Sequence, residues 1–268
     1  MENRLDIVLA ERGLASSRQK AKELISGGHA AVNGKICMKP SFKVSDSDTL
    51  EIVGETLKYV GRGGLKLEKI VELCSPDING KVCMDIGAST GGFTDCMLQN
   101  GAKLVYAVDV GSGQLAEKLC NDKRVINMEK TDIRNVEPSS LETLPEFISV
   151  DVSFISLRLI LGCVYSLLAD GGMAAVLIKP QFEAGRENVG KNGIVKSRNV
   201  HMNILSDITA FAKEKGFALK ALCHSPITGS KGNIEYLMCL EKSGDSIVTD
   251  LKRLVDDAFN TLKTGGKS

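Results

Sequence analysis

The sequence predicts a doubly wound α/β fold: a mostly parallel sheet of seven strands with an antiparallel hairpin at one edge, preceded by a small α+β domain. From residue 82 onward, short apolar runs alternate with amphipathic helical stretches, which is typical of such a sheet. The last two apolar runs lie close together, so we expect them to form the hairpin. Residues 1–43 carry eight Lys and Arg against four acids, whereas the whole chain of 268 residues has a net charge of +1. Two unequal domains are therefore expected.

Residues 1–55 have the pattern of a small basic module. Ser16 and Gln19 have the spacing of a capping box, and the helix that follows them would end at Gly27-Gly28. Asn33-Gly34 is a hairpin-turn signal. The expected elements are a helix over 3–13, a second helix ending at Ile25, and strands over 30–32 and 49–53. The local positive charge favours a polyanionic partner, although an ordinary solvated helix face would explain it as well.

Residues 56–60 are predicted to form a linker, and residues 61–268 the second domain. A helix is expected to begin in the segment Gly61-Arg-Gly-Gly64, and the tail over 246–263 has an amphipathic helical pattern. The expected strands are 82–86, 104–109, 124–128, 147–151, 174–179, 218–223 and 234–240, and the helices between them are 92–100, 114–120, 156–168 and 200–215.

The turn after the first strand of the sheet predicts a ligand site. Asp85-Ile-Gly-Ala-Ser-Thr-Gly-Gly-Phe93 joins a strand to a helix, but its glycines do not have the G-x-G-x-x-G spacing. Ser89 stands where a dinucleotide fold needs a glycine to admit the pyrophosphate, which disfavours NAD. Asp109 ends the next strand, where it could bind ribose hydroxyls, and Asp132 could meet an adenine amino group. A ribose-bearing ligand without a pyrophosphate fits best, and S-adenosylmethionine is the candidate. A plain tight turn, and a surface acid at Asp132, are the alternative interpretations.

Further charged side chains stand where strands of the sheet begin or end. Asp151 and Lys179 each end an apolar run, and Glu235 begins one. An unpaired carboxylate is costly in such a place, so Glu235 is expected to have a partner. Lys66 in the first helix of the domain completes a set of two lysines and two acids. A buried ion-pair network without a catalytic role is the competing interpretation, but such clusters favour functional sites.

The N-terminal module resembles an S4 domain, an RNA-binding fold. The resemblance rests on Arg4-Leu-Asp6, on Gly13-Leu-Ala-Ser-Ser-Arg18-Gln-Lys-Ala-Lys-Glu-Leu-Ile25 and on Val32-Asn-Gly34. It covers roughly residues 1–55. The resemblance implies that Arg4, Arg18, Lys20 and Lys22 contact RNA phosphates.

The four charged residues of the second domain resemble the Lys-Asp-Lys-Glu tetrad of the FtsJ-like ribose 2′-O-methyltransferases. Together with the S4 module, Gly61-Arg-Gly-Gly, Lys179-Pro-Gln-Phe-Glu183 and Gly232-Asn-x-Glu-Tyr236, they make nearly the whole chain similar to the TlyA family. That family is described as rRNA cytidine 2′-O-methyltransferases, and some members carry the label haemolysin. The resemblance implies S-adenosylmethionine as cofactor and ribosomal RNA or ribosomal subunits as partner. The implied catalytic residues are Lys66, Asp151, Lys179 and Glu235; the cofactor-binding residues are Asp85, Gly87, Ser89, Gly91, Gly92, Phe93, Asp109, Asp132 and Asp151; Arg62 joins the RNA-binding set.

A ribose hydroxyl is a poor nucleophile, so the reaction needs its proton removed or its oxyanion stabilised. Lys179 is the candidate for this role. The cofactor's positive charge and Lys66 would disfavour its ammonium form, whereas Asp151 and Glu235 would favour it. A neutral base and a charged stabiliser therefore both remain open. In the loop over 183–199, the stretch 185–193 contains three glycines and two cations, which is consistent either with a lid that faces RNA or with a plain flexible loop.

Composition bounds the remaining possibilities. The eight cysteines form no C-x-x-C pair and the three histidines lie far apart, so no metal site is expected and the chain is expected in the cytoplasm. No apolar run approaches the ~20 residues of a membrane helix. Two other functions were weighed: a non-catalytic RNA-binding ribosome-assembly factor, against which the intact tetrad argues, and a membrane-active haemolysin-like protein, which lacks a spanning segment.

Overall fold

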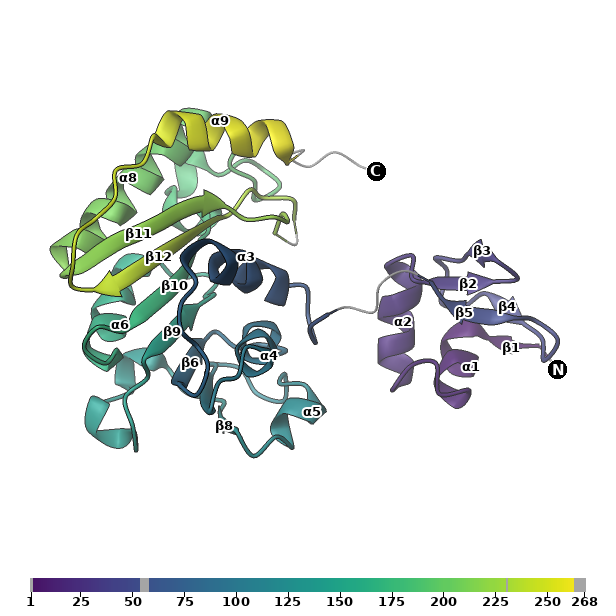
Figure 1. Ribbon diagram of the computed structural model, residues 1–268. Coiled ribbons are helices and arrows are strands. Elements are labelled where there is room, and N and C mark those ends of the chain that lie inside the picture. Colours follow the sequence, from purple (N-terminus) through teal and green to yellow (C-terminus); the bar gives the residue numbers. More distant parts are fainter. Residues whose placement is uncertain (1, 54–57, 230, 263–268) are drawn as a thin grey trace. The chain divides into compact units, whose positions relative to one another are not determined.

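The computed structural model describes residues 2–53, 58–229 and 231–262 (Figure 1). The chain divides into two units, Met1–Lys58 and Tyr59–Ser268. Residues 56 and 57 of the predicted linker lie outside the described residues.

Two helices and two small sheets make up the first unit. Strand β1 (Asn3–Arg4) pairs with β4 (Lys43–Val44), and β2 (Ala30–Val32) lies between β3 (Lys35–Ile36) and β5 (Leu50–Ile52). Helices α1 (Leu5–Glu11) and α2 (Arg18–Ser26) bury their apolar faces against these strands. The helix predicted over 3–13 begins later, because Asn3 and Arg4 are paired with β4. Asn33 and Gly34 both adopt positive φ and turn β2 into β3, a strand that the sequence did not suggest.

A seven-stranded sheet forms the centre of the second unit, in the order β11-β12-β10-β9-β6-β7-β8. Strands β10, β9, β6, β7 and β8 run parallel, and β12 is antiparallel to both β10 and β11. This is the predicted mostly parallel sheet with its antiparallel hairpin. The strands are β6 (Val82–Ile86), β7 (Leu104–Val108), β8 (Val125–Met128), β9 (Phe147–Val150), β10 (Met173–Ile178), β11 (Phe217–His224) and β12 (Tyr236–Lys242).

Helices cover both faces of this sheet, as a doubly wound fold requires (Figure 1). Helices α6, α8 and α9 pack on one face, and α3, α4 and α5 pack on the other. The helix predicted over 156–168 is broken into a 3₁₀ turn, Leu157–Leu159, and α6. The helices are α3 (Gly64–Cys74), α4 (Gly92–Gln99), α5 (Glu117–Cys120), α6 (Leu161–Leu167), α7 (Pro180–Glu183), α8 (Arg198–Glu214) and α9 (Leu251–Thr261).

The topology brings the polar residues to one edge of the sheet. The parallel strands β6, β9 and β10 end at this edge, and Gly87, Asp151 and Lys179 follow them directly. Because β12 is antiparallel, it begins where β10 ends, with Tyr236 opposite Ile178. Glu235 therefore lies at the same edge as Lys179.

Candidate active site

The glycine-rich turn after β6 is shaped by contacts within the protein. Gly87 has a φ of +84°, and a Cβ there would lie 2.5 Å from the backbone oxygen of Asp151. At Gly92, the start of α4, a Cβ would lie 3.0 Å from the backbone nitrogen of Gly64, the start of α3. We expected these glycines to admit a ligand. The structure shows that they first allow the turn to lie against the end of β9 and the start of α3.

Asp85 lies behind the wall of the site. Its side chain is fully buried and accepts hydrogen bonds from the Thr94 backbone N–H (2.8 Å), the Thr94 hydroxyl (2.7 Å) and the Ser149 hydroxyl (2.9 Å). Burial raises the pKa of Asp85 to about 6, although these hydrogen bonds favour the charged form. Asp85 is not among the residues that line the adjacent cavity. Asp85 thus ties α4 to the sheet, and its contact with the cofactor stays a prediction.

Asp109 and Asp132 also do not line the cavity at the carboxyl edge of the sheet. Asp109 follows β7, and its two carboxylate oxygens accept the backbone N–H groups of Ser89 (2.8 Å) and Gly111 (2.7 Å). Asp132 binds Arg134 through both oxygens, with a shortest distance of 2.6 Å, and this contact lowers the pKa of Asp132 to about 2. The structure therefore places Asp109 beside the glycine-rich turn and pairs Asp132 with Arg134, and the cofactor contacts of both acids stay predictions.

A cavity of about 1080 Å³ opens at the carboxyl edge of the sheet. Its volume is at the upper end of the range for ligand pockets. All four tetrad residues line it, together with Gly87, Ser89, Gly92, Phe93 and Arg62 from the predicted binding set. Gly91 is not in the lining. A Cβ at Gly91 would collide with Leu115 and Leu119, so this glycine serves the packing of α5.

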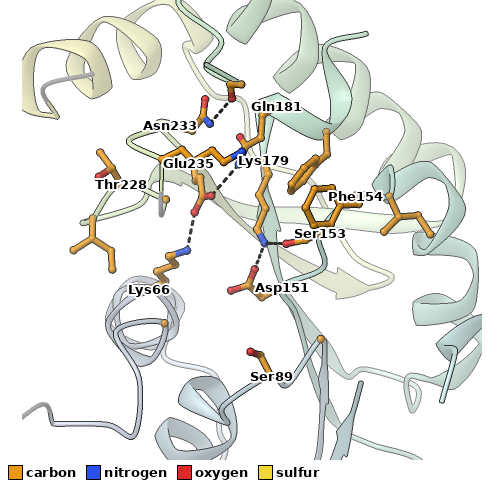
Figure 2. Close-up of a pocket in the computed structure, with 18 of the residues that line it drawn as sticks. Lys66, Ser89, Asp151, Ser153, Phe154, Lys179, Gln181, Thr228, Asn233 and Glu235 are labelled. Carbon is orange, nitrogen blue, oxygen red and sulfur yellow. Dashed lines mark hydrogen bonds and ion pairs between the residues drawn. The ribbon is translucent and has the colours of Figure 1, made fainter. Parts of the chain in front are cut away.

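The first lysine–acid pair of the cavity joins α3 to the residue that precedes β12. Lys66 on α3 contacts Glu235 at the start of β12, with 2.7 Å between Nζ and Oε2 (Figure 2). Both side chains are at least nine-tenths buried. The other oxygen of Glu235 accepts the amide N–H of Gln181 at 3.2 Å. Glu235 therefore has a donor on each oxygen and is held in a fixed orientation.

The second pair lies at the ends of β9 and β10. Lys179 Nζ is 2.5 Å from Asp151 Oδ1 and donates to the hydroxyl of Ser153 at 2.9 Å (Figure 2). The contact with Asp151 is an ion pair without hydrogen-bond geometry, so two of the three N–H donors of a lysine ammonium remain after the bond to Ser153. The four tetrad residues thus form two lysine–acid pairs on the wall of one cavity.

Three further residues of this wall were missed by the sequence analysis. Ser153 and Gln181 each complete the contacts of one pair, and both stand two residues after a tetrad member, a spacing that could have suggested them. Phe154 is 89% exposed and has a φ of +64°, which is unusual for an aromatic residue. Its ring lies 5.0 Å from that of Phe182. Nothing in the sequence indicated this conformation.

Positive charge dominates the lining. It contains five cations, Arg62, Lys66, Lys179, Arg186 and Lys231, and two acids, Asp151 and Glu235.

Asn233 holds part of the loop predicted over 183–199, because it accepts from the Val195 N–H at 3.2 Å and donates to the Gly193 oxygen at 2.8 Å.

In the first unit, the predicted RNA-binding residues lie on or beside α1 and α2. Arg4 and Arg18 both bind the carboxylate of Asp6, with closest distances of 2.8 and 3.0 Å. Lys20 and Lys22 lie on α2 and are half-buried.

Among the described residues, 2–53, 58–229 and 231–262, no helix combines the length and the apolar character needed to cross a membrane. Nor does the described part of the chain contain a group of three or more His, Cys, Asp or Glu side chains arranged to hold a metal ion.

Comparison with known proteins identifies the family. Residues 59–242 match the model of the FtsJ-like methyltransferases, and residues 3–50 match that of the S4 domain. The chain is 47% identical to a Bacillus subtilis protein provisionally named rRNA methyltransferase YqxC, covering 98% of this chain and 96% of the relative.

Two further relatives span nearly the full length. The 16S/23S rRNA (cytidine-2′-O)-methyltransferase TlyA of Mycobacterium tuberculosis is 36% identical, with 98% of each chain covered. A solved structure of a Streptococcus thermophilus protein, provisionally named a hemolysin, is 47% identical, with a TM-score of 0.78 over 98% of this chain and 97% of that one. With an S4 domain and an FtsJ-like methyltransferase domain in one chain, this protein belongs to the TlyA family.

Proposed function

We propose that this protein transfers a methyl group from S-adenosylmethionine to a ribose 2′-hydroxyl of ribosomal RNA, on a cytidine. The observation that carries the proposal is the pair of lysine–acid contacts, Lys66–Glu235 and Lys179–Asp151, on the wall of one cavity beside the glycine-rich turn. The relative from M. tuberculosis is named for this reaction on cytidine. The family and the site chemistry therefore point to the same activity.

The residues around the turn fit a cofactor that carries a ribose and a carboxylate. Asp109 binds two backbone N–H groups, and a carboxylate has about four acceptor positions, so it retains capacity for ribose hydroxyls. Gly87, Ser89, Gly92 and Phe93 line the cavity next to Asp151. When bound, S-adenosylmethionine supplies a methyl group on a positively charged sulfur. These residues would hold it at the side of the cavity formed by β6.

Lys179 is the group placed to hold the proton of the ribose hydroxyl. As the O–CH₃ bond forms and the S–CH₃ bond breaks, the hydroxyl releases one proton. Lys179 would either take up that proton or, as the ammonium, stabilise the oxyanion that forms, and the Asp151 carboxylate at 2.5 Å stabilises the positive charge on Nζ in both cases. Ser153 fixes the direction of Nζ. Lys66, held by Glu235, is left to position the ribose with its remaining N–H donors.

The surroundings of the cavity suit an RNA strand. Five cations against two acids favour a phosphate backbone. Phe154 presents an exposed ring next to Lys179 and Ser153, and exposed aromatic rings are what proteins use to stack an unpaired base. We propose that Phe154 stacks on the base of the nucleotide whose ribose is methylated.

The test is transfer of labelled methyl from S-adenosylmethionine to isolated ribosomal subunits. The wild-type protein should label RNA at a position that resists alkaline cleavage, because a methylated 2′-oxygen cannot attack the neighbouring phosphate. The Lys179→Ala variant should bind S-adenosylmethionine and lose the transfer by about 10²–10⁴-fold. A Lys179→Ala variant that folds and methylates at the normal rate would contradict the role of Lys179. Wild-type protein that labels no RNA would contradict the function.

A further inference from the structure

A single buried carboxylate organises the basic surface of the first unit. Asp6 lies in the first turn of α1, and its side chain has no exposed surface. Arg4 donates to it through Nε (2.8 Å) and Nη2 (3.2 Å), and Arg18 donates through Nε at 3.0 Å. The two arginines come from the starts of two different helices, and Asp6 brings them to one place.

Both guanidinium groups still face solvent. The side chain of Arg4 is 37% exposed and that of Arg18 is 52% exposed. Asp6 takes only one edge of each group, so N–H donors of both arginines remain for an external acceptor. A guanidinium held on one side and open on the other is prepared for bidentate binding of a phosphate.

A third cation stands beside Arg4. In the antiparallel pair of β1 and β4, Lys43 lies directly opposite Arg4, and its side chain is exposed. Like charges directly opposite each other destabilise a strand pair. In the free protein the Asp6 carboxylate offsets part of this repulsion, and a polyanion lying over the two strands would offset the rest.

We propose that Asp6 is a positioning residue that presents Arg4, Arg18 and Lys43 as one site for the phosphate backbone of the RNA substrate. The proposal rests on the proposed function, which makes RNA the partner. Without the carboxylate, the two arginines would repel each other and sample many rotamers. Fixing them in advance lowers the entropy lost when RNA binds. The site keeps a surplus of two positive charges after Asp6 is counted.

The test is a substitution for which simple electrostatics and the proposal predict opposite changes in RNA affinity. Asp6→Asn removes a negative charge from an RNA-binding surface, which by simple electrostatics strengthens RNA binding. The proposal expects the opposite: the dissociation constant for RNA rises about 5–20-fold, because two phosphate contacts lose their preorganisation. The measurement is filter binding of labelled, protein-free ribosomal RNA to the full-length protein at several salt concentrations.

Glu11→Gln is the matched control. Glu11 is exposed at the end of the same helix, so this variant makes the same change in charge without touching the three cations. Its affinity for RNA should stay equal to that of the wild type or rise slightly. If Asp6→Asn binds as tightly as Glu11→Gln, the proposal is wrong.

Lys43→Gln gives a second measurement that does not depend on the buried position. Since Lys43 is exposed, its replacement leaves the fold intact. The slope of log affinity against log salt should become less steep by about one. An unchanged slope would show that Lys43 does not belong to the phosphate-binding site. If Asp6→Asn proves unfolded over residues 5–11 by hydrogen exchange, the Lys43→Gln slope decides whether this surface binds RNA.

The outcomes separate this inference from the proposed function. Wild-type protein that fails to bind ribosomal RNA and fails to methylate subunits would contradict both the proposed function and the role of Asp6. Wild-type protein that binds and methylates, while Asp6→Asn also binds normally, would remove only the role of Asp6.

Discussion

Asp6 in the first unit and Asp85 in the second are both fully buried, yet their pKa values move in opposite directions. Asp6 is held by Arg4 and Arg18, and the hydrogen bond from Arg4 is the main cause that lowers its pKa to about 2. Asp85 receives hydrogen bonds only from neutral groups, and burial raises its pKa to about 6. Charged donors outweigh the effect of burial at Asp6, whereas neutral donors do not outweigh it at Asp85.

The difference carries a consequence for stability. An unfolded aspartate has a pKa of about 3.9. The folded second unit binds a proton at Asp85 more tightly than the unfolded chain does, so its stability falls as pH rises from about 4 to 6. The folded first unit releases the proton of Asp6 more readily than the unfolded chain does. The stability that ionised Asp6 contributes to this unit is therefore lost as pH falls from about 4 to 2.

The largest effect is expected where an acid and a lysine share a cavity. Asp151 resembles Asp6 in having a cation as its partner, but its cation, Lys179, lines the cavity. Asp151→Asn removes the charge that stabilises the protonated Lys179. Methyl transfer should fall by about 10²–10⁴-fold, while RNA affinity measured by filter binding changes less than threefold. A fall in RNA affinity as large as the fall in rate would show that the pair serves binding instead.

An intermediate effect is expected at Asp85. Asn fits the same contacts, because its oxygen can accept from Thr94 and its N–H₂ can donate to Ser149. Asp85→Asn should therefore abolish the decline in stability between pH 4 and 6, which amounts to about 3 kcal/mol in the wild type.

Tyrosine fluorescence during urea unfolding measures the unfolding free energy of the second unit at each pH. The chain has no tryptophan, and its four tyrosines are Tyr59, Tyr106, Tyr165 and Tyr236, all in the second unit. The signal therefore reports this unit alone. A wild-type unfolding free energy that is flat between pH 4 and 6 would contradict the raised pKa of Asp85.

The smallest effect is expected for the first unit in acid. Hydrogen-exchange protection of residues 5–11 should decrease as pH falls from about 4 toward 2, after correction for the intrinsic exchange rate. High salt should reduce this protection only modestly, since the carboxylate is buried although the arginines are exposed. Protection that persists unchanged at pH 2 would mean that the ion pairs of Asp6 contribute little to folding.

Alternating apolar runs predicted the sheet well, and the meeting of Asp151, Lys179 and Glu235 followed from strand direction alone. What escaped prediction depends on partners from distant segments. The segment expected to be one helix over 156–168 begins with a 3₁₀ turn, and Glu183, a distant residue, accepts from the Ser156 hydroxyl and the Leu157 N–H at its start. The sequence position of Asp85 reveals neither Thr94 nor Ser149 as its hydrogen-bond partners. Asp132 is different: Arg134, two residues later, was visible in the sequence as a competing partner.

The contact between Lys66 and Glu235 joins residues 169 positions apart. At 5–20 residues per second, a ribosome takes roughly 10–30 s to pass from one to the other. For that interval Lys66 of α3 lacks its partner Glu235, and β12 is missing from its place beside β10. A chain released early by a stalled ribosome therefore lacks half of its ion pairs at the cavity. Only a translation product that extends past Tyr236 can assemble the site, which makes completeness of synthesis a condition for acting on RNA.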